Sequence, residues 1–421
     1  MADGSTTLNA EVGKGYFLDT NAGVIEVFLP TSPTRGDTVI LADYSGTFAT
    51  NKVFVNTGGA LIDSTEGGPG SSNDFELTTN NQVVELVYVD ASKGWLVQIN
   101  SAPSGLSAVD GGGTYNSGFI SATGGTVTTS GDYKIHTFTG DGCFVVSSLG
   151  ANVPCAQAST VDYMVVAGGG GGSGGPSGDG GGGGGAGGFR ESKDSTLSSP
   201  HTASPLAATT GITITTSTYP VTVGSGGAGG SVYRQAGTNG SNSSFSTITS
   251  AGGGGAGANT TVALAGGSGG GSGSGGGSWP RAGGSGNTPP TSPSQGNPGG
   301  NANPTGPDQN AGGGGGATVA GTNGAAPGGG DGGAGATTSI SGTPTVYAGG
   351  GAGMTGAPSP AGVASGGTGG GGNGGRSCGG AAATAGSANT GGGGGGSGAS
   401  NPPDAGQSGG KGIVIIRYKY Q

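Results

Sequence analysis

The fold is decided by the stretch Val161-Asp162-Tyr163-Met164-Val165-Val166-Ala167-Gly168-Gly169-Gly170-Gly171-Gly172, in which an apolar strand-like segment runs straight into glycine. The chain leaves glycine in the same manner at Gly410-Lys411-Gly412-Ile413-Val414-Ile415-Ile416-Arg417-Tyr418. Nearly all of the long glycine runs lie between these two segments. A disordered linker has no reason to begin and end at segments that can pair, and an unpaired apolar edge strand invites aggregation. We therefore predict that 163–167 and 413–418 are neighbouring strands of one sheet, which closes the base of the glycine-rich region.

Composition gives two opposing signals. Glycine accounts for 110 of the 421 residues, and only 8% of residues are charged. Glycine loses more backbone entropy on folding than any other residue, so such a chain must be flexible or held by dense backbone hydrogen bonding. Sequence-driven disorder usually accompanies high charge. Sparse charge therefore favours a packed chain, with a loose glycine-rich surface as the alternative. The runs have no fixed period, which excludes collagen and a regular solenoid.

The runs are suited to polyglycine II helices, which are left-handed, extended and have three residues per turn. Their amides point outward in three directions and can bond to neighbouring chains, and only glycine lets such chains lie close enough. Replacing Gly314 or Gly393 by valine should therefore destabilise the region. Ala186, Ala256 and Ser397 interrupt or border the runs and are expected to face outward or to lie in an outer layer.

The remainder of the sequence predicts β-structure with essentially no α-helix. Seven short strands separated by turn residues indicate a small sandwich or open barrel at the N-terminus. The fold class is therefore an all-β N-terminal module followed by a β-framed polyglycine II helix bundle. The predicted divisions are an N-terminal β module at 1–100, a linker at 101–112, a β frame at 113–167, the glycine-rich helix domain with loops at 168–410, and a closing strand at 411–421.

Charge and hydropathy exclude several classes of partner. The formal charge of −9 is spread thinly and forms no basic patch, so nucleic acid is not expected as a partner. No run of about 18 apolar residues exists, and the first residues lack a basic segment and an apolar core, so neither membrane insertion nor a secretory signal is predicted. The cysteines do not form a disulfide framework. Cys143 and Cys155 either pair with each other or, like Cys378, are buried free thiols.

Catalytic and ligand-binding patterns are weak. Gly-x-Gly-x-x-Gly recurs by chance without a βαβ context, and Lys411 lies outside a phosphate-loop pattern. His136 and His201 lack a nearby carboxylate-rich cluster, which argues against a zinc site or a catalytic triad. Asp179 and Asp331 are expected to be outward-facing and solvated, because the calcium-binding nonapeptide repeat is absent. We predict no enzyme activity, no catalytic residues, no cofactor and no metal.

Candidate recognition residues lie in the long segments that interrupt the glycine pattern, at 189–210 and 278–310. Mobile polar loops on a rigid scaffold are where binding residues accumulate. Trp279 beside Arg281 could stack on a sugar face while the guanidinium donates to hydroxyl or carboxylate groups; alternatively, Trp279 caps the ends of the glycine helices. The receptor-binding candidates are Phe189, Arg190, Lys193, Tyr233, Trp279, Arg281 and Tyr347.

The entering and leaving strands and the glycine runs together resemble the distal adhesins of bacteriophage long tail fibres of the T-even type. Similar patterns occur in glycine-rich virion structural proteins of marine and cyanobacterial phages. The resemblance implies packed polyglycine helices with receptor-binding loops between them. One departure is clear, because the T-even-type adhesins concentrate aromatic residues in their tip loops, whereas Ser, Thr, Asn and Pro dominate here.

This resemblance implies a non-enzymatic virion appendage protein that is made in the host cytoplasm without a signal peptide and works at the virion surface. The N-terminal module would bind other virion proteins of the tail or fibre, with a homotrimer among the arrangements left open. The loops would bind a host cell-surface glycan or an outer-membrane protein. Two alternatives are a purely structural fibre or head-decoration protein and an ice-binding polyglycine bundle; the second needs a flat, regular Thr or Ala face.

Overall fold

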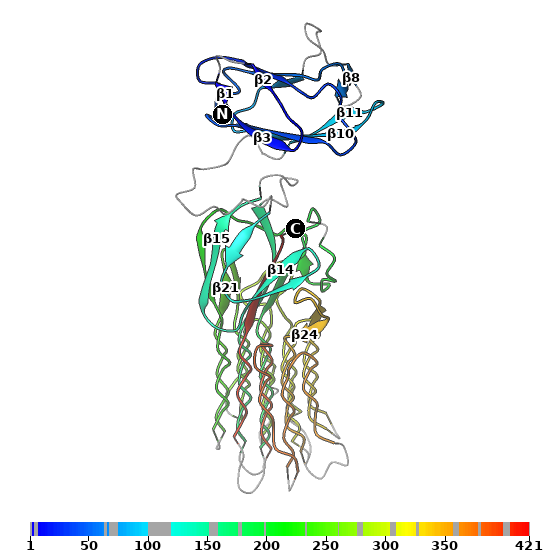
Figure 1. Ribbon diagram of the computed structural model, residues 1–421. Coiled ribbons are helices and arrows are strands. Elements are labelled where there is room, and N and C mark those ends of the chain that lie inside the picture. Colours follow the sequence, from blue (N-terminus) through cyan, green and yellow to red (C-terminus); the bar gives the residue numbers. More distant parts are fainter. Residues whose placement is uncertain are drawn as a thin grey trace. The chain divides into compact units, whose positions relative to one another are not determined.

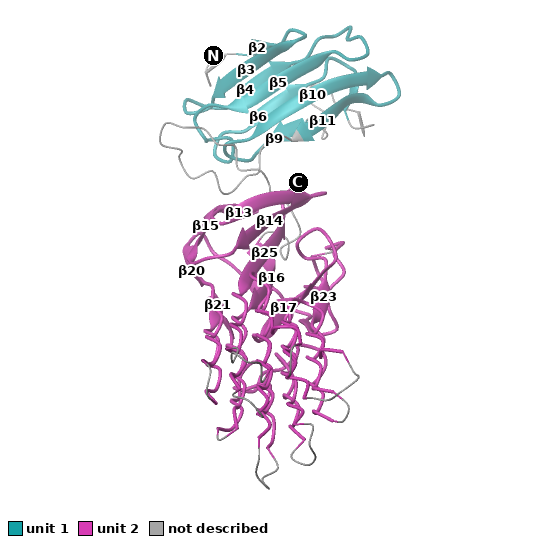
Figure 2. Cartoon of the chain, turned by 90° about the horizontal axis from the view of Figure 1, so that it is seen from below, with its two compact units in different colours: residues 1–115 teal, residues 116–421 magenta. Residues whose placement is uncertain are grey.

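The computed structural model describes residues 2–3, 7–62, 65–66, 75–99, 119–150, 159–175, 179–197, 199–231, 234–259, 261–275, 281–303, 309–325, 328–356, 362–377, 380–398 and 405–420. The ordered elements in these ranges are β-strands, which confirms the predicted all-β class. The chain divides into two compact units, residues 1–115 and 116–421 (Figure 2). The predicted linker at 101–112 lies outside the described residues.

The N-terminal unit is a sandwich of two sheets that do not close into a barrel. One sheet has the order β1-β3-β5-β10-β11-β7-β8 and the other β2-β4-β6-β9. The strands are β1 (Ala2–Asp3), β2 (Leu8–Asn9), β3 (Lys14–Asp19), β4 (Ile25–Phe28), β5 (Thr38–Asp43), β6 (Val53–Asn56), β7 (Leu61–Ile62), β8 (Thr65–Glu66), β9 (Phe75–Leu77), β10 (Val83–Asp90) and β11 (Gly94–Ile99). All seven strands that the sequence predicted in this module are present.

The first seven strands of this unit alternate between the two sheets. β2, β4 and β6 pair in parallel in one sheet, and β1, β3 and β5 pair in parallel in the other. Alternate side chains of each strand face inward, as the period of a pleated strand requires. Both sheets contribute to one apolar core, in which Leu18, Val39 and Trp95 of one sheet meet Val27 and Val55 of the other.

The second unit begins with two sheets that form a frame for the glycine-rich chain (Figure 1). One has the order β12-β15-β20-β21-β22 and the other β13-β14-β25-β16-β17-β18, with β19 also paired to β16 and a separate hairpin β23-β24. The strands are β12 (Ser121–Thr123), β13 (Thr126–Ser130), β14 (Tyr133–Phe138), β15 (Gly142–Ser148), β16 (Thr160–Val166), β17 (Phe189–Ser192), β18 (Ala207–Ala208), β19 (Ile212–Thr213), β20 (Thr218–Thr222), β21 (Ser243–Phe245), β22 (Ile248–Ser250), β23 (Ala336–Thr338), β24 (Thr345–Tyr347) and β25 (Ile413–Lys419).

The strands that bracket the glycine-rich region lie side by side, as predicted. β16 and β25 pair in antiparallel register, with Val165 opposite Val414 and Asp162 opposite Arg417. The two faces of this strand pair contribute to different cores. Val414 and Ile416 pack between the two frame sheets, whereas Ile413, Ile415 and Met164 pack against the frame-side ends of the glycine-rich segments.

From the frame, straight extended segments run out and back along one direction (Figure 1); we call each segment an arm. The arm at 168–175 shows how they are joined. Its successive amide groups donate to three neighbouring arms in strict rotation, so that every third residue bonds to the same neighbour. The acceptors for residues 168 to 174 are, in order, Ser241, Gly410, Gly185, Thr238, Gln407, Gly182 and Gln235. This period of three is that of a polyglycine II helix.

Three further arms surround 168–175 on its other sides. Gly253, Gly394 and Gly227 donate to the carbonyl groups of residues 168, 170 and 169. A carbon atom added to Gly170 would overlap the carbonyl group of Gly254, which lies on one of these arms. Each interior arm therefore needs glycine because neighbouring backbones occupy every direction. The prediction that the runs are ordered, extended and mutually hydrogen-bonded is confirmed.

The expectation that the non-glycine residues inside the runs face outward is wrong. Ala186, Ala256 and Ser397 are all fully buried. Ala186 belongs to the core where the arms meet the frame sheet. Ser397 lies toward the other end of its arm, where its hydroxyl accepts a hydrogen bond of 2.9 Å from the amide of Gly175. Ala186 and Ser397 lie near opposite ends of their arms, and there they supply packing or a hydrogen bond that glycine does not.

Candidate functional site at the end of the bundle

A buried carboxylate holds several arms together at the end of the bundle away from the frame. Asp179 is 5% exposed. Its Oδ2 accepts hydrogen bonds from Arg234 Nε at 2.5 Å and from Asn259 Nδ2 at 2.7 Å. Arg281 extends the network, since one guanidinium nitrogen donates to Asn259 Oδ1 at 2.6 Å and another to the carbonyl of Ala258 at 3.3 Å.

The expectation that Asp179 is outward-facing and solvated is wrong. Asp179 is not solvated, because the positive charge of Arg234 and an amide donor replace its water. Asp331, in contrast, is exposed as expected and accepts a bond of 2.7 Å from the Ser365 amide. Of the sequence candidates, Arg281 belongs to the network. Tyr233 and Trp279 lie outside the described residues.

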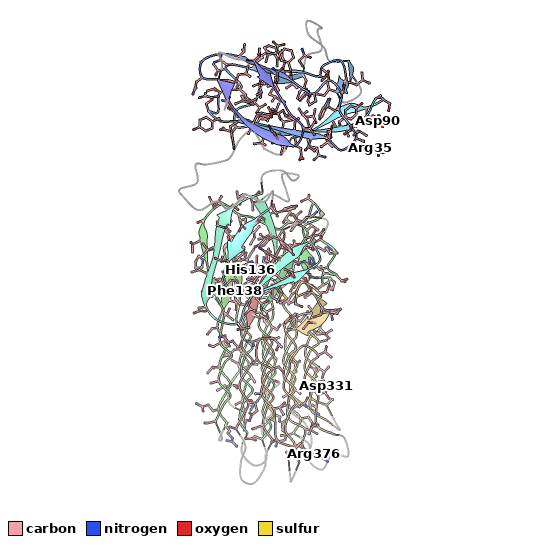
Figure 3. The ribbon with its side chains drawn as sticks, in the orientation of Figure 1. Arg35, Asp90, His136, Phe138, Asp331 and Arg376 are labelled. Atoms are coloured by element: carbon pink, nitrogen blue, oxygen red, sulfur yellow. The ribbon has the colours of Figure 1, made fainter. Side chains whose placement is uncertain are left out.

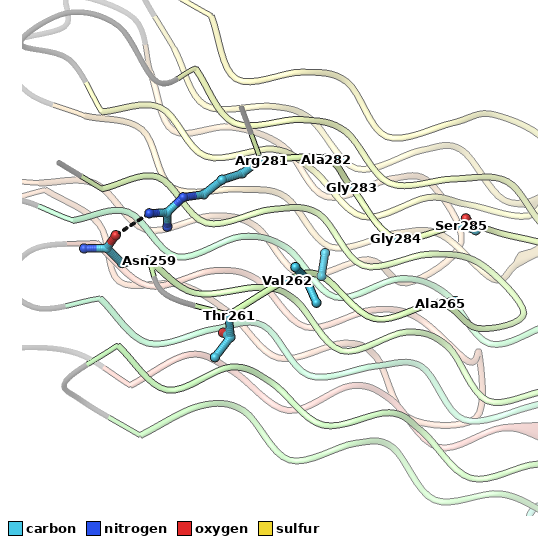
Figure 4. Close-up of a pocket in the computed structure, with 10 residues that line it drawn as sticks. Asn259, Thr261, Val262, Ala265, Arg281, Ala282, Gly283, Gly284 and Ser285 are labelled. Carbon is cyan, nitrogen blue, oxygen red and sulfur yellow. Dashed lines mark hydrogen bonds between the residues drawn. The ribbon is translucent and has the colours of Figure 1, made fainter. Parts of the chain in front are cut away.

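An open groove adjoins the network, with a volume of about 690 Å³ (Figure 4). Its walls come from two arms. One arm contributes Asn259, Thr261, Val262, Ala263 and Ala265, and the other contributes residues 281–285. Val262 is 79% exposed, which is high for an apolar side chain, whereas Arg281 is only partly exposed. The groove therefore combines a guanidinium, an amide side chain and apolar surface, a mixture typical of small-molecule and saccharide sites.

The remaining sequence candidates lie at the frame, at the opposite end of the arms. Phe189 is 1% exposed and Tyr347 is 5% exposed, and both pack in the core between the frame sheet and the arms. Arg190 lies on β17 and is partly exposed, opposite Val165. Lys193 donates to the carbonyl of His201 at 2.5 Å. The five described candidates therefore do not form one site, and the side chains of Phe189 and Tyr347 are packed in a core.

A buried polar cluster lies beside these residues, on the frame-sheet face that turns toward the arms. Asp162, Glu191 and Arg417 are each at most 2% exposed. Asp162 Oδ1 accepts a bond of 2.7 Å from the amide of Asp194. Glu191 accepts hydrogen bonds from the Thr338 hydroxyl and from the amide of Ser204. Sequence reasoning missed this cluster, although a charged residue within an apolar strand, as at 162, is a signal for one.

Arg417 is the cation of the cluster. Its guanidinium lies 4.8 Å from the centre of the Tyr133 ring and donates to the carbonyl of Ile340 at 3.2 Å. Burial raises the pKa of Asp162 to about 7, despite the attraction of Arg417. Burial also raises the pKa of Glu191 and lowers the pKa of His201 to about 4. At neutral pH His201 is therefore uncharged and Asp162 is close to its midpoint.

The cluster contains serine, histidine and aspartate, yet its geometry differs from that of a catalytic relay. Ser199 Oγ lies 2.7 Å from His201 Nδ1, and Asp162 Oδ2 lies 4.0 Å from the same nitrogen. A relay places the hydroxyl and the carboxylate on opposite nitrogens of the ring. All three residues are at most 4% exposed, which keeps substrate from the hydroxyl. The other histidine, His136, is fully buried in the frame, 3.0 Å from the Tyr418 hydroxyl and 2.7 Å from the carbonyl of Gly124.

In the described parts of the chain, no group of three or more His, Cys, Asp or Glu side chains is placed to hold a metal ion. In those same ranges, no helix has both the length and the apolar character needed to cross a membrane. Cys143 is a free thiol, but it is exposed, so the expectation that it is buried is wrong. Its possible partner Cys155 lies outside these ranges.

The frame sheets and the hydrogen-bonded arms together form a β-framed polyglycine bundle. A glycine-rich domain family model matches residues 146–419, which is more than half of the chain. The chain therefore belongs to this glycine-rich domain family, and the match spans both bracketing strands and every arm between them. No curated protein matches the sequence.

Proposed function

We propose that this chain is a non-enzymatic surface protein of a bacteriophage particle, either a tail fibre or a comparable appendage, that attaches the particle to its host. In this proposal the N-terminal sandwich binds other virion proteins or fellow subunits. The end of the bundle away from the frame meets a host cell-surface glycan or an outer-membrane protein. The resemblance to phage tail fibre adhesins and the geometry of the bundle both support this assignment.

The lattice of arms is the observation that carries the proposal. Arms bonded along their whole length make a stiff support, and rigid scaffolds commonly present binding residues at loops and ends. Charged side chains are rare in the arms, and those of Asp179, Arg234, Arg281 and Arg376 lie toward the end away from the frame. Figure 3 shows Arg376 near this end and Asp331 farther from it. Such a distribution suits a shaft that displays its chemistry at one end.

Localisation on the virus particle tests the proposal directly. Antibodies against the full chain are applied to purified particles of the virus that encodes it, and gold-labelled particles are imaged by electron microscopy. We expect label at a tail or other appendage, and we expect Fab fragments against the bundle to reduce adsorption to host cells. Labelled particles that adsorb normally with saturating Fab would assign the chain to a structural fibre or head-decoration role. Unlabelled particles would overturn the proposal.

A further inference from the structure

The groove lies where the lattice leaves out one of its regular bonds. The arms 261–267 and 281–286 are neighbours, and the amide of Gly266 donates to the carbonyl of Ser285 at 3.2 Å. Because the pattern repeats every three residues, the amide of Ala263 should donate to the carbonyl of Ala282. That bond is not made, and neither group has a hydrogen-bond partner among the described residues. The two arms part here, and the groove opens between them.

A guanidinium without a directly paired carboxylate lies beside this gap. Arg281 reaches from one wall to Asn259 on the other (Figure 4). It also donates to the carbonyl of Ala258. No described carboxylate lies within 4.0 Å of its guanidinium. The nearest candidate, Asp179, is already neutralised by Arg234. Asp179 attracts Arg281 only from beyond 4.0 Å, so Arg281 retains N–H groups to which no described carboxylate is hydrogen-bonded.

We infer that this groove binds an acidic saccharide, with a sugar carboxylate on Arg281 and sugar hydroxyls on the free backbone groups of Ala263 and Ala282. A hydroxyl both donates and accepts, so one sugar can satisfy the amide of residue 263 and the carbonyl of residue 282. The fork geometry of a guanidinium matches a carboxylate. Val262 offers apolar surface to the C–H face of a sugar ring. This inference rests on the proposed function and names its ligand class and site.

Titration calorimetry of the full-length chain tests the inference. The probes are hexamers of galacturonate, mannuronate and guluronate, together with a neutral galactose hexamer. We expect at least one acidic hexamer to bind about tenfold or more tightly than the neutral one, because a charge-assisted pair is lost in the latter. Arg281→Ala should weaken acidic binding by about tenfold or more, and Arg281→Lys should restore only part of it.

Ala263→Pro tests the backbone donor itself. Proline removes the amide hydrogen while its fixed φ suits the extended conformation of an arm. It should weaken binding several-fold. Two control variants should bind as the unmodified chain does, namely Ala320→Pro on another exposed arm and Arg376→Ala outside the groove. Thermal unfolding identifies any variant that fails to fold.

The outcomes separate this inference from the proposed function. Failure of all three acidic hexamers to bind at millimolar concentration, or equal binding by Arg281→Ala, would overturn the saccharide site even if antibodies label the particle. Acidic binding that depends on Arg281, found with unlabelled particles, would support the site and overturn the proposed function. Equal affinity for neutral and acidic hexamers would refute the role of the guanidinium.

Discussion

Replacing Gly393 by alanine tests whether the arms form a close-packed lattice. Gly393 lies within the arm 391–398, and its amide donates to the carbonyl of Gly349 at 2.9 Å. A methyl carbon added to Gly393 would lie 1.9 Å from the carbonyl oxygen of Gly184 and 2.7 Å from the amide nitrogen of Gly351. Those two groups already bond to each other at 2.8 Å. The added carbon would therefore overlap both the donor and the acceptor of a hydrogen bond between two other arms.

The expected loss of stability follows from this overlap. Side-chain carbons essentially never come within 3.0 Å of another heavy atom, so the arms must separate by at least 3.0 − 1.9 = 1.1 Å. Such a shift disrupts the bonds from Gly393 to Gly349 and from Gly351 to Gly184. Each leaves a buried donor or acceptor without a partner, at a cost of roughly 1–3 kcal/mol. The free energy of unfolding should fall by about 4 kcal/mol for the two bonds together.

Gly362→Ala is the matched control, because no atom lies within 4 Å of a carbon added at this exposed position. It should change the free energy of unfolding by less than about 1 kcal/mol. Guanidinium unfolding followed by circular dichroism measures both variants. Amide exchange of peptides from 391–398, read by mass spectrometry, reports the same region locally. Equal stability of the two alanine variants, or fast exchange throughout this arm in the unmodified chain, would refute the lattice.

Three further predictions concern the frame. The raised pKa of Asp162 adds stability below about pH 4 that is lost as the pH rises through about 7, whereas the lowered pKa of His201 adds stability above 6.5 that is lost as the pH falls through about 4. As the pH rises from 4 to 7, His201→Asn should therefore become less stable, because only the effect of Asp162 remains. As the pH rises from 4 to 6.5, Asp162→Asn should become more stable, because only the effect of His201 remains. Denaturant midpoints that change in parallel with pH in the two variants would contradict this assignment. Phe189→Ala should lower the free energy of unfolding by about 3–5 kcal/mol because it empties core volume, and an unchanged melting temperature would show that this side chain is not packed. Cys143 should react with iodoacetamide in the folded chain, as mass spectrometry of its peptide would show; protection would indicate that it is paired or covered.

The sequence predicted the architecture well, because its two strongest signals are local. An apolar strand that ends in glycine is visible at 161–172, and its antiparallel partner is visible at 412–418. The need for glycine in the interior arms is likewise a property of the backbone and holds wherever arms pack on all sides. The seven strands of the N-terminal module follow from alternation and turn residues in the same way. None of these features depends on knowing which distant residues meet.

The candidate site was only partly predictable, because the residues that interact in it are distant in sequence. Phe189-Arg190-Glu191-Ser192 looked like an exposed charged loop, yet it is a strand of the frame sheet. The carboxylate of Glu191 is satisfied by Thr338, which lies 147 positions away. Asp179 looked solvated because its neighbours are glycines, but Arg234 and Asn259 meet it from other arms. Arg281 was chosen as a candidate because of its residue type and its position at the end of a glycine run, without knowledge of its hydrogen-bond partners.

The same lattice explains where this chain can carry specificity. Inside the bundle, a carbon added to most glycines would overlap neighbouring backbone, so few interior positions can vary without loss of stability. Alanine is nevertheless fully buried within arms at Ala256 and Ala352. Serine is accepted where arms end, as Ser173 shows by donating to the carbonyl of Gly257 at 2.7 Å while accepting from the amide of Gly182 at 2.8 Å. Side chains of other kinds are confined to surface arms and arm ends. A groove between two surface arms, with one lattice bond left open, is therefore a place where recognition can change while the shaft keeps its structure.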